Sequence, residues 1–329
     1  MQKTYLIFKK YLPIILAVSA LALIFGLLTM VYYYSDNTMS IDFKNVIPIF
    51  TAALVLIAFV LSIVFTFKVN NTGISKIKKS FGVCKFASLL AATLAAASFF
   101  FDFFRFVDQP GQFSVFRIIR LIVFIPFIAY LIINVIPKKI KRKRVTLPVW
   151  LKPVTAFSSL IWCILGLVMI YFWQAPSYST VLGTTNIFKV AFIIYYLFVT
   201  IFFIFEIKYE FISSAPKGYV LFSSFLFVYS ITIIGPIMLK TVLSESSNLG
   251  SISLFEIFLA FALGLYALAK MIAMQQTMRF VIKKRGGSTH AHRHHHHHHH
   301  HKHSKSEGAD ATNTDDTLAE IVINESDNK

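Results

Sequence analysis

Residues 12–34 read LPIILAVSALALIFGLLTMVYYY, a stretch without a single charged side chain. A helix needs about 20 mostly apolar residues to cross the hydrocarbon core of a bilayer. Lys9 and Lys10 precede the stretch, as basic residues precede the hydrophobic region of a signal peptide. The apolar run is longer than such a region, so we predict a retained transmembrane helix.

Seven further stretches have the same length and apolar character: 46–67, 86–104, 115–136, 154–173, 186–205, 219–239 and 252–272. The chain of 329 residues is 56% hydrophobic and 14% charged, whereas a soluble domain averages about 25% charged residues. This composition argues against a soluble enzyme, a disulfide scaffold and a disordered chain. We predict an all-α integral membrane protein with eight transmembrane helices at residues 1–285, followed by a tail at 286–329.

Basic residues divide unequally between the two sides of the predicted helices. The formal net charge is +17, and the alternate segments that begin with the N-terminus hold 22 Lys and Arg. The opposite side and its helix ends hold six, namely Lys44, Arg105, Arg117, Arg120, Lys189 and Lys240. Because cytoplasmic loops carry the excess of Lys and Arg, we predict that both termini are cytoplasmic, in a multi-pass protein of the cell membrane.

The densest basic run lies at 138–144, between the fourth and fifth predicted helices. Lysine and arginine near a membrane surface attract anionic lipid headgroups by about 1 kcal/mol per residue. We expect this loop to contact such headgroups. The positive-inside bias accounts for the basic balance of the chain, so we expect no binding of nucleic acid.

The two halves of the membrane domain share a weak internal similarity. Gly26 falls on Gly166 at an offset of 140 residues, and neighbouring Pro and Ser residues match at the same offset. Offsets of 136 to 139 give matches for later helices. One interpretation is a parallel duplication into four-helix repeats at 1–137 and 150–285. The alternative is chance similarity between apolar helices.

Charged residues near the predicted outer helix ends form a candidate substrate-binding site. Arg117 and Arg120 lie three residues apart and therefore share a helix face. Asp102 lies at the outer end of the third helix, and Glu256 lies at the start of the eighth. The arginines could hold an anionic group; the alternative is a structural ion pair with arginines that extend to the interface. If the repeat is real, Arg117 and Glu256 are equivalent, and we expect them to pair.

The predicted helices contain no relay of buried Asp, Glu or His, and the first His is residue 290. Proton- and cation-coupled pumps usually carry such residues inside the membrane. We therefore expect neither a proton relay nor a metal site among the helices. No nucleophile has an evident activating base, so we expect no enzymatic activity. The Ala- and Ser-rich stretch 87–98 predicts a tightly packed, central helix.

The tail at 286–329 is His-rich and then acidic, and its composition predicts disorder. Neutral imidazoles chelate borderline metals such as zinc and nickel. We expect loose metal binding, adventitious or buffering, and no required cofactor. The candidate ligands are the unbroken run His294, His295, His296, His297, His298, His299, His300 and His301.

Two functional classes fit these observations. One is a transporter or permease-like protein for a small neutral or anionic solute. A parallel repeat that contains a helix kinked by Pro and Gly weakly favours this class. The other is a non-transporting membrane sensor, assembly factor or complex subunit whose cytosolic tail binds a partner protein.

Overall fold

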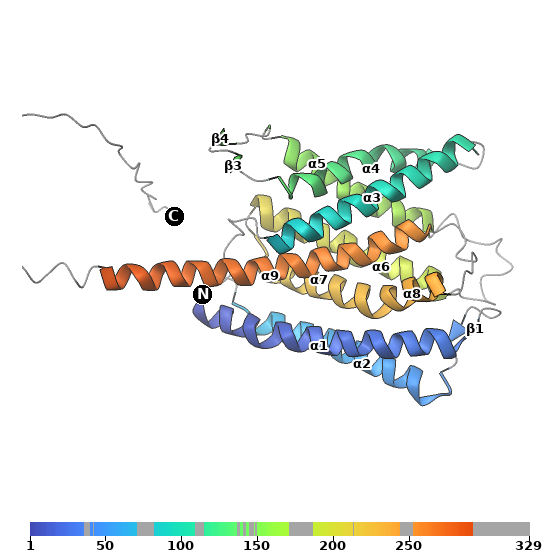
Figure 1. Cartoon of the computed structure of the whole chain (residues 1–329), viewed down its shortest axis with the longest axis horizontal. Helices are drawn as coiled ribbons and strands as arrows, with labels where there is room; N and C mark the ends of the chain where they lie inside the picture. Colours follow the sequence, from blue (N-terminus) through green and yellow to red (C-terminus); the bar gives the residue numbers. More distant parts are fainter. Residues whose placement is uncertain are drawn as a thin grey trace, which may run out of the picture. The chain divides into compact units, whose positions relative to one another are not determined.

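The computed structural model describes residues 1–35, 40–41, 43–70, 82–108, 115–136, 139–140, 143–144, 148, 150–170, 187–212, 214–243 and 253–291. The chain divides into a unit Met1–Gly286 and a unit Gly287–Lys329. The described part is almost entirely helical (Figure 1), and eight of its helical segments are long and apolar enough to cross a membrane. The prediction of eight such helices is confirmed, and they indicate a multi-pass membrane protein.

Six of these segments are single helices, and the other two carry π-helical turns. They are α1 (Gln2–Tyr32), α2 (Val46–Lys68), α3 (Gly82–Asp108), α4 (Val115–Ile133), α5 (Leu151–Val168), α6 (Ile187–Ile207) with the π-helix η5 (Lys208–Ile212), α7 (Pro216–Tyr229) with η6 (Ser230–Ile234) and α8 (Gly235–Leu243), and α9 (Leu254–Ala291). Strand structure among the described residues is limited to two antiparallel hairpins, which pair β1 (Tyr34–Ser35) with β2 (Ser40–Ile41) and β3 (Lys139–Ile140) with β4 (Lys143–Arg144).

Several helices extend past the predicted apolar stretches. The first begins at Gln2, and α6 with η5 continues to Ile212 through Glu206 and Glu210. Polar residues do not end a helix, because the helix satisfies its own backbone hydrogen bonds regardless of the side chains. The apolar stretch therefore marks only part of each helix, and the charged residues just beyond it can still be enclosed by the bundle.

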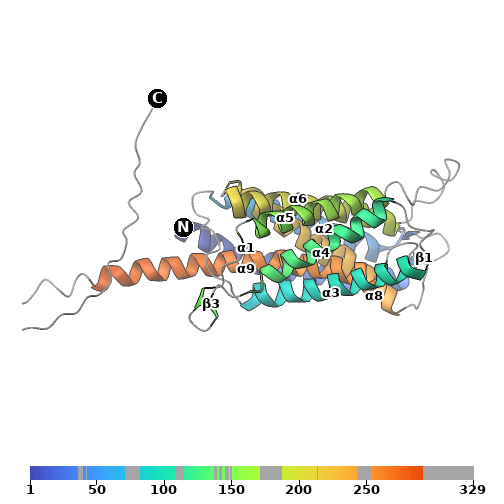
Figure 2. The ribbon, with the colours of Figure 1, turned by 90° about the horizontal axis from the view of Figure 1, so that it is seen from above.

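The helix α9 and the segment Pro216–Leu243 are the most enclosed, with 72% and 78% of their most apolar windows buried, against 39% for α3. Figures 1 and 2 show α9 running among the other helices, and Cys84 of α3 donates to the carbonyl of Ala269 at 3.1 Å. The predicted close packing of residues 87–98 is therefore confirmed, but α3 is not the central helix. Its small-residue face is buried with Cys84 against α9, and Phe99 packs against Phe124 of α4.

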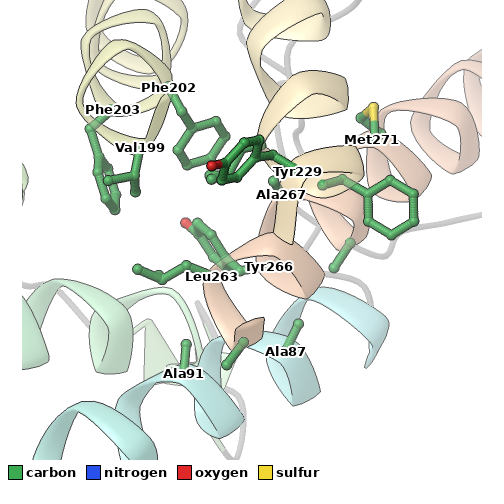
Figure 3. Close-up of a cluster of buried hydrophobic side chains, with 14 of the residues drawn as sticks. Ala87, Ala91, Val199, Phe202, Phe203, Tyr229, Leu263, Tyr266, Ala267 and Met271 are labelled. Atoms are coloured by element: carbon green, nitrogen blue, oxygen red, sulfur yellow. The ribbon is translucent and has the colours of Figure 1, made fainter. Parts of the chain in front are cut away.

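Aromatic and small side chains fill the space between α6, α9 and α3 (Figure 3). Phe202 and Phe203 of α6 and Tyr266 of α9 are fully buried. Ala87 and Ala91 present the small face of α3 to this cluster, which lets the helix backbones approach closely. This packing fixes the relative rotation of α6 and α9, and so fixes which polar side chains of the two helices meet.

Gly264 of α9 marks a close approach to η6. A methyl group added at Gly264 would overlap the side chain of Ser230. We expect Gly264→Ala to lower the free energy of unfolding in detergent by about 1–3 kcal/mol, because overpacking of a tight core costs that much. Gly82→Ala is the matched control, since no atom of a described residue lies within 4 Å of the added methyl group, apart from Gly82's own chain neighbours and helix backbone. Equal stability of the two variants would contradict the close packing of α9 on η6.

Candidate functional site

A buried ion pair joins α4 to the first turn of α9. Arg120 Nη2 lies 2.7 Å from Glu256 Oε1, and the two residues are only 8% and 7% exposed. Tyr196 of α6 completes the group: its hydroxyl donates to Glu256 and lies 2.5 Å from Arg120 Nη2. We call Arg120, Tyr196 and Glu256 the arginine cluster.

The start of α9 places Glu256. Ser253 precedes the helix, and its Oγ accepts the backbone N–H of Glu256 at 3.1 Å. A serine followed three residues later by glutamate is the capping-box pattern, in which the glutamate normally reaches back to the helix start. Here the Glu256 carboxylate instead extends to Arg120. The cap therefore fixes the helix start, and with it the position of the carboxylate.

Aromatic rings enclose the guanidinium of Arg120. Its Cζ lies 4.8 Å from the centroid of the Trp162 ring and 5.5 Å from that of Tyr196. Such cation–π contacts gain about 2 kcal/mol or more where water is excluded. They partly replace the hydration that the buried guanidinium has lost.

Three buried donors beside the arginine cluster have no acceptor among the described residues. They are Nε of Arg120, Nε1 of Trp162 and the hydroxyl of Tyr195. Tyr195 lies close enough to Arg120 to interact with it electrostatically, and its ring centroid is 5.3 Å from that of Tyr196. A buried donor without an acceptor costs about 1–3 kcal/mol. The surroundings of Arg120 therefore contain more donors than acceptors.

The structure brings most of the predicted site together, with one change of partner. Glu256 makes its ion pair with Arg120, whereas the repeat predicted Arg117, which interacts with Glu256 electrostatically. Arg117 is half-buried one turn earlier on α4. Asp102, also half-buried, lies within electrostatic reach of Glu256, Arg120 and Arg117. The change of partner follows from helix rotation, because the buried face of α4 passes through Arg120.

A second buried ionic group lies nearer the other end of α6 and α9. Lys270 Nζ is 2.8 Å from Glu206 and 2.9 Å from Glu210, and Lys152 of α5 also contacts Glu210. Glu206 is fully buried and Lys270 is 5% exposed. We call Glu206, Glu210 and Lys270 the lysine cluster. Neither Glu206 nor Glu210 lies in a predicted stretch, so neither was a predicted site residue.

Hydroxyl groups complete the lysine cluster. Tyr266 donates to Glu206 Oε1 at 2.8 Å, and Tyr219 of α7 donates to the same oxygen at 3.4 Å. Asn134 donates to the hydroxyl of Tyr266 at 3.3 Å. The second oxygen of Glu206, Oε2, is buried without a donor among the described residues.

Sequence reasoning missed the lysine cluster because charged residues end an apolar stretch. Glu206 follows the predicted stretch 186–205 directly, and Lys270 lies two residues before the end of the stretch 252–272. A signal was available: Glu206 and Glu210 are four residues apart and share a helix face. Two acidic side chains on one helix face, at the end of an apolar run, favour a basic side chain buried beside them.

Stacked aromatic side chains lie between the two clusters. The rings of Phe127 and Trp162 have centroids 4.7 Å apart, and Phe203 approaches Phe127 at 6.0 Å and Tyr130 at 6.2 Å. Glu256 and Lys270 are 14 residues apart on α9, which corresponds to about 21 Å along the axis. The polar path between α4, α6 and α9 is therefore interrupted by an aromatic layer.

The described residues contain no group of three or more His, Cys, Asp or Glu side chains that could hold a metal ion. The candidate ligands His294 to His301 lie outside the described residues, as does most of the tail. Comparisons with protein-family models, curated proteins and solved structures find no match for this chain.

Proposed function

We propose that the protein is a transporter of the permease type for a small anionic solute, and that Arg120 binds the solute. The observation that carries this proposal is the group of buried donors without acceptors at Arg120, Trp162 and Tyr195. A solute rich in acceptors would satisfy these donors, and hydrogen bonds from a guanidinium to an anion are among the strongest in proteins.

The charge near the arginine cluster supports an anion. Arg105, Arg117 and Arg120 all interact electrostatically with Asp102, as does Glu256, so three cationic side chains gather beside Asp102. An entering anion would also compete with Glu256 for Arg120 Nη2, because that nitrogen holds the carboxylate at 2.7 Å. Solute binding would thereby weaken a contact between α4 and α9.

The lysine cluster favours transport of the solute over binding at one site alone. Ionisable residues inside membrane helices are costly and commonly mark ion and substrate pathways. Both clusters use α6 and α9, so a shift of one helix against the other would alter both. The segment Pro216–Leu243 offers a place for such a shift, because the π-helix η6 is followed directly by Gly235 and Pro236.

The proposal also covers the orientation of the protein in the membrane. We propose that both termini are cytoplasmic in the cell membrane, from the excess of Lys and Arg in alternate loops. The arginine cluster then lies toward the outer surface and the lysine cluster toward the cytoplasm. The parallel four-helix duplication remains a hypothesis about the origin of this bundle.

A ligand panel followed by a flux assay tests the function. Full-length protein is heated with chloride, phosphate, sulfate, acetate, lactate or glucose. We expect at least one anion to raise the melting temperature, because a ligand at 100 times its Kd adds about 2.7 kcal/mol of stability. The labelled anion should then enter proteoliposomes containing the protein, and glucose should have no effect.

Variants separate binding from nonspecific salt effects. Arg120→Gln combined with Glu256→Gln removes both charges of the buried pair together, and it should abolish the stabilisation and the uptake. Arg279→Gln, on an exposed position of α9, should retain both. A panel without any stabilising anion contradicts the proposal. Stabilisation without uptake contradicts transport and favours the alternative of a sensor.

A further inference from the structure

A cavity of about 450 Å³ lies between α1, α2, α6 and the segment of η6 and α8. Its wall is formed by residues within 26–30, 48–59, 190–194 and 229–237, together with Ile41 and Phe43. Small-molecule sites typically measure about 300–1,000 Å³. None of its lining residues belongs to the arginine cluster or the lysine cluster, so the cavity is a separate feature of the bundle.

The polar side chains on the wall are satisfied by the protein itself. The hydroxyls of Thr29 and Thr51 lie 2.9 Å apart and bond to each other. Tyr229 donates to the carbonyl of Ala191 at 2.8 Å, and Thr232 donates to a carbonyl of its own helix at 2.8 Å. A polar solute would lose hydrogen bonds to water here without replacement, whereas a hydrocarbon would not. The wall therefore selects an apolar occupant.

The cavity opens through the side of the bundle. Five of its lining residues are exposed, among them Leu56 at 65%, Val190 at 41% and Ile194 at 36%. In a multi-pass membrane protein this lateral surface contacts lipid chains. An occupant therefore enters from the bilayer.

The length of the cavity fits one leaflet. Its lining on α2 runs from Pro48 to Phe59, which corresponds to about 16 Å along the helix. Half the hydrocarbon thickness of a bilayer is about 15 Å. The cavity begins near the end of α2 that follows Lys44, and so lies in the leaflet at that end. We propose that it binds one acyl chain of a membrane phospholipid, held by apolar contacts.

This proposal is tested by native mass spectrometry of the full chain, independently of any anion binding. Palmitoyl-oleoyl phosphatidylglycerol is titrated into delipidated protein. We expect one lipid to bind at least about 10-fold more tightly than later ones. Dioctanoyl phosphatidylglycerol, which has the same headgroup and shorter chains, should lack this tight step. Equal affinity for the two lipids, or no tight step for the long-chain lipid, would overturn the proposal.

Two substitutions on α2 form a matched pair for the same experiment. Val55→Trp places a large ring on the cavity wall and should eliminate the tight step. Val60→Trp puts the same ring on a position that is 48% exposed and outside the wall, and should preserve it. Retention of the tight step by a folded Val55→Trp would refute the assigned position.

The combined substitutions Thr29→Val and Thr51→Val provide a further variant that keeps the shape of the wall. An acyl-chain site should bind the long-chain lipid as before or more tightly, because the wall becomes more apolar. Loss of the tight step would show that the hydroxyls recognise a polar ligand, and would overturn the proposal.

Discussion

Lys270→Met is expected to remove most of the folded protein, because it leaves the fully buried Glu206 without its cation and removes one of the two cations that contact Glu210. Lys270 lies 2.8 Å from Glu206 and 2.9 Å from Glu210, and Glu206 is fully buried. Removing one partner of a buried ion pair typically costs about 3–5 kcal/mol. This loss is a large fraction of the net stability of most proteins. The measurement is the fraction of protein that elutes as a monodisperse species from detergent, with its melting temperature.

A second variant identifies the cause of that loss. Glu206→Gln and Glu210→Gln added to Lys270→Met remove both carboxylates that Lys270 contacts, and they should recover most of the stability. The control Lys283→Met changes an exposed lysine on the same helix and should leave the melting temperature within a few degrees of wild type. Lys270→Met as stable as this control, or no recovery in the triple variant, would contradict the charge balance assigned to the lysine cluster.

The eight helices could be predicted from the sequence because the bilayer imposes a simple requirement. Each crossing needs about 20 apolar residues, and the stretches that begin at residues 12 and 46 meet it. The packing of the helices imposes no comparably simple pattern. The Ala-rich stretch 87–98 suggested a central helix, but α9 is more enclosed. Small residues show that one face packs closely, and they do not show how many neighbours a helix has.

The site could be predicted only to within one helical turn. Arg120 and Glu256 were both candidates, but the hypothesis of an internal repeat paired Glu256 with Arg117. The choice between arginines three residues apart depends on the rotation of α4 against α9, which side chains from several helices fix. Tyr196 and Trp162 were not predicted as neighbours of Arg120, because aromatic residues within an apolar helix look the same whether they face lipid or a charge.

The second large effect concerns the ion pair of Arg120 with Glu256, which a double-mutant cycle can isolate. Arg120→Leu leaves a buried carboxylate without its cation, and Glu256→Leu leaves a buried guanidinium without its anion. Each is expected to lower the free energy of unfolding by about 3–5 kcal/mol. The double variant leaves neither charge, and replacing a whole buried pair by apolar residues is often nearly neutral. We therefore expect the double variant to be more stable than either single variant.

The matched cycle replaces Arg120 with Arg117, one turn earlier on the same helix. Arg117 is half-buried, and Glu256 makes its 2.7 Å ion pair with Arg120. Arg117 interacts with Glu256 electrostatically, and the coupling energy of two residues is largest where they are in direct contact. Arg117→Leu combined with Glu256→Leu should therefore show a coupling energy below about 1 kcal/mol, against several kcal/mol for Arg120. The opposite order of the two coupling energies would restore Arg117 as the partner. It would also require α4 to be rotated by about 60° from its observed orientation, because three residues of an α-helix fall short of a full turn by that angle.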